Sequence, residues 1–368
     1  MRTGFSTSAC AAAAAVAALR ALTGGKTVAN VAIDLPTRRG VAFSIVRCEW
    51  EGDGVRCGVI KDAGDDPDVT NGLEIQALVR PSETGRIEIQ GGIGVGTVTL
   101  PGLSVAVGEA AINPGPRRLI LHALRTETER LGLAPEIGLS VTVCVPDGER
   151  IARETMNPKL GIVGGISILG TDGLVHPYSV PAFRTSLYYE LKVAKENGSR
   201  TVAFATGKRS LQYLKSVLPK SNELELINVG DEIGFPIDRA LRFGFSGIYI
   251  GGMIGKLSKL AQGRFQTHVN EGEVDFDFLA SVAVKAGAQP RDAETIRTCR
   301  TARQAQQLLK PFGVRLEPIL IEMAAQSVWE RCRGQADIGV YLFNLTGDLL
   351  ASQIYWVLIK KRIMLSWR

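Results

Sequence analysis

Short apolar runs alternate with helix-length segments through the second half of the chain, and this alternation constrains the fold more than any other feature. Runs such as Thr201–Ala205 and Gly247–Ile250 are separated by helical stretches such as Arg209–Val217. Parallel strands need crossover connections, so the pattern predicts a parallel sheet covered by helices. We expect an α/β (Rossmann-like) domain over residues 157–345, with strands at 201–205, 224–229 and 247–250 and helices at 184–196, 209–217, 238–243, 254–261, 277–286 and 293–309.

The first half lacks that alternation and predicts an α+β domain over residues 1–156. Its strands are expected at 28–33, 41–49, 55–61, 75–79, 86–89 and 139–145, and a helix is expected at 117–131. The boundary is placed near Met156-Asn157-Pro158. Residues 346–368 are expected to form a C-terminal extension, either packed or frayed. The run Tyr355–Ile359 followed by Lys360-Lys361-Arg362 keeps a membrane-surface helix as an alternative.

The alanine-rich run Ala9–Leu22 resembles a signal peptide at first sight. However, alanine is only weakly apolar, Arg20 interrupts the run, and no polar cleavage region follows. The run therefore predicts a helix capped by Ser6 or Thr7. No stretch reaches the roughly 20 apolar residues that a membrane span needs, so stable membrane insertion is not expected.

Composition narrows the classes of partner. The net charge is +6, but no basic run exceeds three residues and aromatic residues make up only 6%. Nucleic-acid binding is therefore not expected, and the charge suits either scattered contacts with an anionic ligand or a mildly basic surface. Six cysteines without a Cys-x-x-Cys pair, and only three histidines, argue against a metal site. Reduced thiols and a cytoplasmic location are expected.

The segment Lys61–Asp68 holds four carboxylates within seven positions. Such crowding is costly unless the charges meet solvent, N–H groups, cations or a ligand. It predicts either an acid–base or ligand-orienting loop or an Asx-turn with solvated charges. It is not an EF-hand, because Gly64 occupies the third ligand position.

Three glycine-rich segments remain. Gly91–Gly96 fits either an anion-binding nest or a tight hairpin. Asn157–Thr171 fits either a nucleotide-type ligand at the first strand of the α/β half or a domain linker. Gly251–Ser258 fails as a phosphate loop, because Ile250 and Leu257 stand where Gly and Ser or Thr are required. A strand, a glycine turn and a helix with Lys256 and Lys259 remain, which suit a carboxylate, with His268 as a further donor.

Taken together, these segments resemble one family, the cobalt-precorrin-5B C1-methyltransferases (CbiD family), over about residues 1–345. The matching motifs, in order, are Arg2–Ala13, Lys61–Thr70, Gly91–Gly96 with Thr99–Gly102, Ala111–Arg117, Gly161–Thr171 and Gly255–Ala261. The departures are Ser8, where glycine is expected, and the tail after about Leu345.

The resemblance implies methyl transfer from S-adenosylmethionine to C1 of cobalt-precorrin-5B, giving cobalt-precorrin-6A in cobalamin biosynthesis. Cobalt enters only as part of the tetrapyrrole substrate. With the resemblance accepted, Asp65 or Asp66 is the candidate base. Donor binding is assigned to Gly161, Gly164, Gly165, Gly170 and Thr171. Pairing with substrate carboxylates is assigned to Lys61, Arg117, Lys256, Lys259 and His268.

Two alternatives stay open, as does a homo-oligomer. A tetrapyrrole carrier without catalysis would bind the corrinoid tightly and have no donor site. A phosphoryl transferase using Gly91–Gly96 would bind a nucleoside triphosphate with magnesium, although the failed phosphate-loop match counts against it. No Gly-x-Ser-x-Gly or His-Glu-x-x-His motif supports a hydrolase or a metalloprotease.

Overall fold

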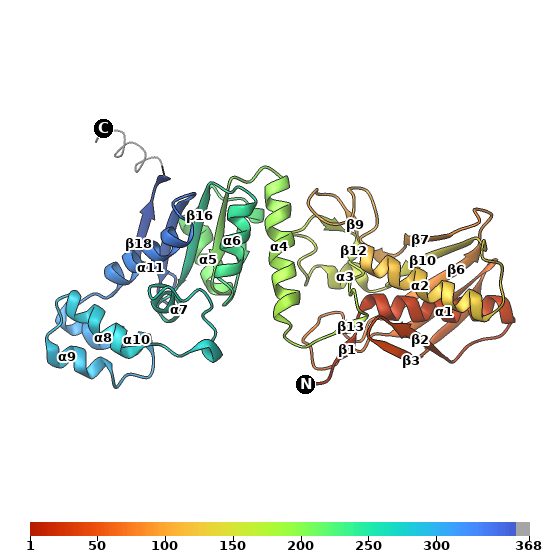
Figure 1. Ribbon diagram of the computed structural model, residues 1–368, viewed down its shortest axis with the longest axis horizontal. Helices are drawn as coiled ribbons and strands as arrows, with labels where there is room; N and C mark the ends of the chain where they lie inside the picture. The colour runs from red at the N-terminus through yellow and green to blue at the C-terminus, as the bar shows by residue number, and fades with distance from the viewer. Residues whose placement is uncertain (358–368) are drawn as a thin grey trace. The chain divides into compact units, whose positions relative to one another are not determined.

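The computed structural model describes residues 1–357 and divides the chain into two compact units, Met1–Val180 and Pro181–Arg368 (Figure 1). Both units mix helices with sheets, in agreement with the mixed α and β content expected from the sequence. The first unit contains α1 (Thr7–Gly24), α2 (Pro114–Arg130), α3 (Gly148–Ala152), β1 (Gly4–Phe5), β2 (Asn30–Leu35), β3 (Arg38–Ser44), β4 (Arg47–Glu51), β5 (Gly54–Ile60), β6 (Glu74–Pro81), β7 (Ile87–Gly91), β8 (Gly94–Val95), β9 (Thr97–Val98), β10 (Leu139–Cys144), β11 (Ile162–Val163), β12 (Gly165–Ile166) and β13 (Leu174–Val175).

The alanine-rich segment forms α1, the central helix of the first unit. Ser6 caps it by accepting a hydrogen bond from the N–H of Ala9, and Gly25 ends it in the left-handed conformation. The helix is long and apolar enough to cross a membrane by length and composition, but most of it is buried inside the unit. Buried alanines on all sides let β5, β6 and α2 approach closely, and α1 and α2 lie side by side (Figure 1). It is therefore a core helix.

The main sheet of this unit has the order β4-β5-β6-β10-β7 and is antiparallel except for the parallel pair β10–β7. A separate hairpin pairs β2 with β3, and β2 packs against α1 with alternate residues buried. The single strand predicted over 41–49 is wrong, because the chain changes partner there. Ile45 donates to the carbonyl of Ala29 in the hairpin, whereas Val46 donates to that of Gly58 in the main sheet.

The glycine-rich segment 161–171 belongs to the first unit. β11 pairs with β9, and β12 pairs with β8. The predicted domain boundary near residue 156 therefore lies inside the first compact unit, which continues to Val180. The segment is not the first strand of the α/β half. That strand is β14 (Thr201–Ala205).

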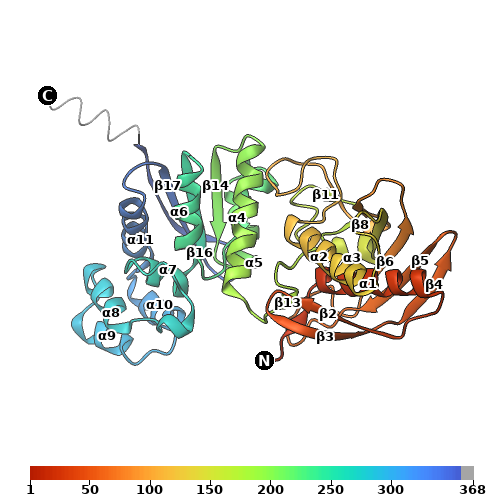
Figure 2. The ribbon, with the colours of Figure 1, turned by 45° about the vertical axis from the view of Figure 1, so that its right-hand side comes forward.

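The second unit is built on a sheet with the order β15-β14-β16-β17-β18. Its strands β14, β16 and β17 are labelled in Figure 2. β14 to β17 run parallel, and β18 is an antiparallel edge strand. The other strands are β15 (Leu226–Asn228), β16 (Gly247–Met253), β17 (Asp337–Phe343) and β18 (Leu349–Tyr355). The helices are α4 (Val180–Glu196), α5 (Lys208–Val217), α6 (Gly234–Arg242), α7 (Ile254–Leu260), α8 (Phe276–Lys285), α9 (Pro290–Ile296), α10 (Ala302–Leu309) and α11 (Glu317–Arg331).

Alternation along the strands sorts these helices onto two faces. Ala203 and Ala205 of β14 pack in a small cluster with Leu214 of α5. Val202 and Phe204 point the other way, into the large core that contains α4, α6 to α8, and α11. The parallel sheet is thus covered on both faces, which is why its strands are almost entirely apolar.

Two predictions for this unit are wrong in detail. The helix predicted over 293–309 is two helices, because Thr301 caps α10 by accepting from the N–H of Gln304. The extension predicted from residue 346 is in part a strand, because β18 completes the sheet. The basic run Lys360-Lys361-Arg362, which suggested a membrane-surface helix, lies in residues 358–368, outside the described residues.

Candidate functional site in two clusters

The start of α1 is tied to the end of the glycine-rich segment. The hydroxyl of Ser8 donates to the carbonyl of Gly170 at 2.7 Å and lies 2.8 Å from the hydroxyl of Ser6. Thr7 binds both the N–H and the carbonyl of Leu169. The serine that departs from the family pattern therefore makes part of this contact itself.

The acidic loop lies beside the same helix start. Thr3 forms a β-bridge with Gly64, and the N–H of Phe5 donates to the carbonyl of Asp62. Arg2 clamps the carboxylate of Asp62 through two hydrogen bonds of 2.6 and 2.7 Å. These bonds, with a backbone N–H from Gly64, lower the pKa of Asp62 to about 2. Three sequence motifs thus meet in the first unit: the N-terminal signature, the acidic loop and Gly170.

Asp68 is held by a buried ion pair. The Lys61 side chain is 1% exposed, and its ammonium lies 2.7 Å from Asp68 Oδ2. Thr70 donates to Asp68 Oδ1 from both its N–H and its hydroxyl. Burial by itself raises the pKa of Asp68, but Lys61 and Thr70 together lower it below its usual value. Lys61 therefore serves the loop and is not free to bind a substrate carboxylate.

Asp65 and Asp66 differ from the other two carboxylates. Asp65 accepts from the N–H of Arg2 at 2.6 Å, and Asp66 accepts from the N–H of Tyr178 at 3.2 Å. Within residues 1–357 neither carboxylate forms a salt bridge, and Asp65 is exposed. Tyr178 is one of two non-glycine residues in the described chain with a positive φ (55°), and its side chain is exposed. Arg2 and Tyr178 were not predicted. Arg2 lies within the N-terminal motif, but nothing in the sequence signals the backbone conformation of Tyr178.

Backbone packing explains three of the four glycines predicted to bind the donor. A Cβ at Gly165 would collide with the backbone of Gly94, and one at Gly161 would collide with Leu100. Gly170 has a positive φ and packs against Ser6, while only Gly164 borders open space. The reason for predicting a donor site there, its place at the first strand of the α/β half, is wrong. Thr171 lies next to Gly115 in the first turn of α2.

Arg117 also has a structural task. Its guanidinium donates to the carbonyls of Ile112 and Ile89, which fixes the start of α2 against β7. It is half-buried, so its charge reaches the surface only in part.

The remaining predicted residues form a second cluster, in the second unit. The Lys256 ammonium donates to the carbonyls of Thr206 and Gly230, at 2.7 and 3.2 Å, and pairs with Asp231 at 3.0 Å. Lys259 is buried and donates to the carbonyl of Thr267. Burial lowers the pKa of Lys259. The hydrogen bonds of these two ammonium groups join neighbouring loops of the second unit. The sequence had predicted that both groups would pair with a ligand carboxylate.

The other members of this cluster surround Asp231. Thr267 donates its hydroxyl to Asp231 Oδ1 at 2.7 Å. Burial by itself raises the pKa of Asp231, but Thr267 and Lys256 lower it overall, and the charge of His268 contributes. His268 uses its Nδ1 to cap a short 3₁₀ turn, Val269–Glu271. Asp231 was not predicted, although its position in the loop that follows the strand β15 was a usable signal.

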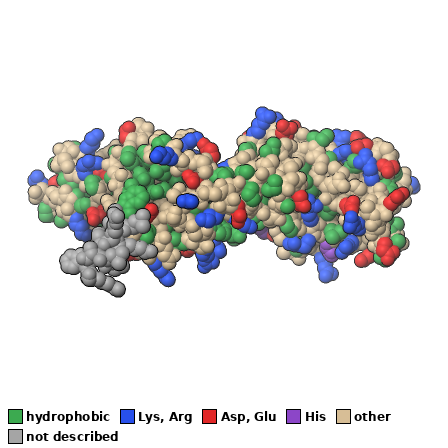
Figure 3. All heavy atoms as spheres, turned by 90° about the horizontal axis from the view of Figure 1, so that it is seen from above, with side chains coloured by type: hydrophobic (Ala, Val, Ile, Leu, Met, Phe, Trp, Pro, Cys, Tyr) green, Lys and Arg blue, Asp and Glu red, His purple; other side chains and the backbone are tan. Residues whose placement is uncertain are grey.

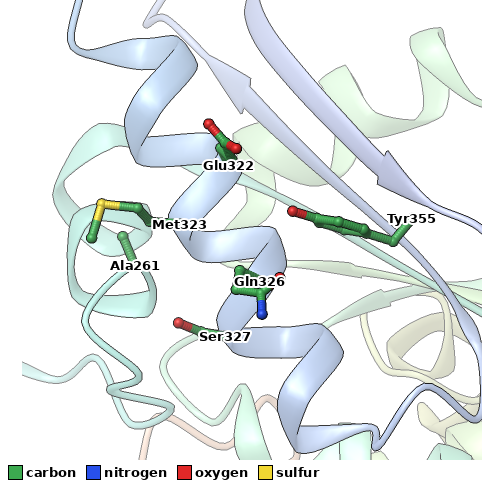
Figure 4. Close-up of a pocket in the computed structure, with 6 residues that line it drawn as sticks. All are labelled: Ala261, Glu322, Met323, Gln326, Ser327 and Tyr355. Carbon is green, nitrogen blue, oxygen red and sulfur yellow. The ribbon is translucent and has the colours of Figure 1, made fainter. Parts of the chain in front are cut away.

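One hollow in the second unit contains none of these residues. It measures about 350 Å³ and lies on α11, between α7 and β18 (Figure 4). Its lining residues are Ala261, Glu322, Met323, Gln326, Ser327 and Tyr355. On the face drawn in Figure 3, Lys and Arg side chains are scattered among Asp and Glu and form no continuous basic stripe.

Comparison with known proteins identifies the family. The model of the family CbiD matches residues 1–177, and that of the CbiD C-terminal domain matches residues 266–353. The cobalt-precorrin-5B C(1)-methyltransferase of Geobacillus kaustophilus is 40% identical over 96% of this chain and 95% of its own. The protein of the same name from Thermus thermophilus is 46% identical over 86% of this chain and 83% of its own.

A solved structure is also similar in sequence. The crystal structure of the cobalamin biosynthesis protein cbiD from Archaeoglobus fulgidus is 30% identical, covers 74% of this chain and 84% of its own, and superposes with a TM-score of 0.40. The family model over the first unit and relatives of 40% identity over nearly the whole chain lead to one conclusion: this chain belongs to the CbiD family.

Proposed function

We propose that this protein transfers a methyl group to C1 of cobalt-precorrin-5B in cobalamin biosynthesis. The observation that carries the proposal is that relatives with this activity in their name are 40 to 46% identical over at least 83% of both chains. S-adenosylmethionine is the proposed donor, since it supplies an electrophilic methyl group on sulfur. The electron pair of the ring carbon forms the new C–C bond as the S–CH₃ bond breaks, which leaves S-adenosylhomocysteine.

We propose that the first unit binds the tetrapyrrole beside the acidic loop. Leu169 and Tyr178 are exposed, and contacts with Thr7 and Asp66 respectively fix their backbones. Exposed apolar side chains next to hydrogen-bonding groups suit a flat ring with polar substituents. Among the predicted substrate cations, Lys61 and Arg117 support this surface from within.

Asp65 and Asp66 are the proposed base. The other two carboxylates of the loop are engaged by Arg2 and Lys61, so a proton released from the substrate has Asp65 or Asp66 as its acceptor. The chemistry needs only alignment of the methyl group with C1 and removal of that proton.

We propose that the second unit has a Rossmann-like fold. The protein is proposed to work in the cytoplasm, as expected for a biosynthetic enzyme. A tetrapyrrole carrier is the alternative, and it predicts binding of the ring without release of S-adenosylhomocysteine. No relative reported above carries a phosphoryl transferase name.

The test is incubation of the purified protein with cobalt-precorrin-5B and methyl-labelled S-adenosylmethionine, followed by mass spectrometry. We expect one labelled methyl group on the ring and one equivalent of S-adenosylhomocysteine. Asp65→Asn and Asp66→Asn should lower turnover by about 100-fold in at least one variant, while the exposed control Glu83→Gln should not change it. Unlabelled tetrapyrrole recovered in a tight complex would replace the proposal with the carrier. Full turnover in both variants would remove the loop as the base.

A further inference from the structure

Three buried residues in 1–357 have a hydroxyl group without a hydrogen bond to the protein: Ser199, Thr206 and Ser210. The hydroxyl oxygen of Ser199 is closed to solvent, whereas those of Thr206 and Ser210 are not. Every other buried polar side chain in that range has a partner for at least one of its atoms. Polar groups of buried residues normally find protein partners, so a hydroxyl group that has none and is not enclosed is available to a ligand. Two of the three, Thr206 and Ser210, stand four residues apart at the start of α5, where each is 4% exposed.

The start of α5 carries a second unusual feature. Gly207, its N-cap, supplies no side chain to cap the helix, and the first turn begins with the exposed cations Lys208 and Arg209. Positive charge at a helix N-terminus is unfavourable, because the peptide dipoles already place positive charge there. An anion at this position would satisfy both the N–H groups and the two hydroxyls.

The strand order of the sheet indicates that ligands can bind at this position. β14 is flanked by β15 on one side and β16 on the other, and the chain turns in opposite directions from it. Parallel sheets bind ligands outside the carboxyl ends of the strands at such a reversal. Thr206 and Gly207 directly follow the carboxyl end of β14, and Gly251 and Gly252 are at that of β16.

Asp231 completes the arrangement. It follows the neighbouring strand β15, and its Oδ1 is held by Thr267 and Lys256, whereas its Oδ2 takes no hydrogen bond from residues 1–357. Lys256 binds both the carbonyl of Thr206 and the carboxylate of Asp231, each within 3.0 Å of the same nitrogen. The start of α5 and Asp231 are therefore held side by side, with one side suited to an anion and the other to hydroxyl groups.

We infer that the carboxyl edge around β14, between its neighbours β15 and β16, is the binding site for the S-adenosyl donor, with its amino-acid carboxylate on Thr206, Ser210 and the start of α5, and its ribose hydroxyls on Asp231. This inference rests on the proposed methyl transfer. It moves the donor from Gly161–Thr171 to the second unit, where the rule that suggested those glycines applies to β14.

The test compares two ligands that differ in the part the site is inferred to hold. S-adenosylhomocysteine carries the amino-acid carboxylate, and 5′-methylthioadenosine lacks it. Calorimetric titration of the full chain with each ligand is carried out for the wild type, Thr206→Val, Ser210→Ala and the double variant. Ser199→Ala is the matched control, because it removes the third unbonded hydroxyl from the same unit.

We expect the double variant to bind S-adenosylhomocysteine about 10-fold or more weakly, since each hydrogen bond to a charged group is worth about that factor. Its affinity for 5′-methylthioadenosine should be unchanged, and the control should match the wild type with both ligands. Equal weakening for both ligands, or none for either, would overturn the inference while leaving methyl transfer intact. If the wild type binds no S-adenosylhomocysteine, with or without the tetrapyrrole, the proposed function fails together with the site.

Discussion

Replacing Lys61 by methionine should destabilise the first unit through the carboxylate that it leaves behind. The variant fills a similar volume but removes the ammonium 2.7 Å from Asp68 Oδ2. Breaking a buried ion pair typically costs about 3–5 kcal/mol. Asp68 is 26% exposed and keeps two hydrogen bonds from Thr70, so the low end of that range, about 3 kcal/mol, is expected.

Asp68→Asn should lower the free energy of unfolding by at least as much, because it leaves the Lys61 ammonium without its counter-charge in a side chain that is only 1% exposed. In the double variant Lys61→Met, Asp68→Asn neither charge remains. Its loss in free energy of unfolding should therefore be about 2 kcal/mol smaller than the sum of the losses in the two single variants.

The assay is urea unfolding of the full chain, with hydrogen exchange in peptides from β5 and β6 reporting on the first unit. Arg86→Met is the control, because its salt bridge with Glu88 joins two side chains that are 75% and 32% exposed. It should cost less than about 1 kcal/mol. Single costs as small as this control, or strict additivity in the double variant, would refute the view that burial couples the pair.

Two further predictions concern pH and packing. The pKa of Asp68 is lower in the folded protein than in the unfolded chain. The stabilisation by this carboxylate is therefore fully present above its ordinary pKa of about 4 and is lost as the pH falls through the folded value. Urea midpoints of the wild type should fall more steeply below about pH 4 than those of Asp68→Asn, and parallel curves would contradict this. Gly94→Ala should lower the free energy of unfolding by about 3 kcal/mol or more, because Gly94 has a φ of 71° and a Cβ there would collide with the carbonyl of Val145. Gly108 has a φ of 90° but faces open space, so Gly108→Ala should cost about 1 kcal/mol in the same unfolding assay.

The limits of prediction from the sequence lie where partners are distant in the chain. The strand at 201–205 and the capped helix after Ser6 follow from local pattern, and both form where expected. The glycine-rich segment 161–171 did not reveal its partners, because a short strand with glycines fits a hairpin, a linker or a ligand loop equally well. Its pairing with β8 and β9 decides among these.

Charged residues were harder to interpret than apolar ones. Lys256 and Lys259 were expected to face a ligand, but the carbonyls of Thr206, Gly230 and Thr267 take up their hydrogen bonds. A lysine in a glycine-rich turn carries the same signal whether it binds an anion or joins two strand ends. The unbonded hydroxyls of Thr206 and Ser210 likewise become visible only once every buried partner is accounted for.

The alanine helix α1 also bears on how the chain folds as it is synthesised. Its partners β5, β6 and α2 and the anchor at Gly170 are all made later, the last of them about 160 residues after Ser8. At roughly 5–20 residues per second, a ribosome needs on the order of ten seconds or more to supply them. During that time an apolar segment of 18 residues lacks its native contacts. This helix is thus made before the partners that bury it, and during the interval its apolar surface is exposed to contacts that lead to aggregation.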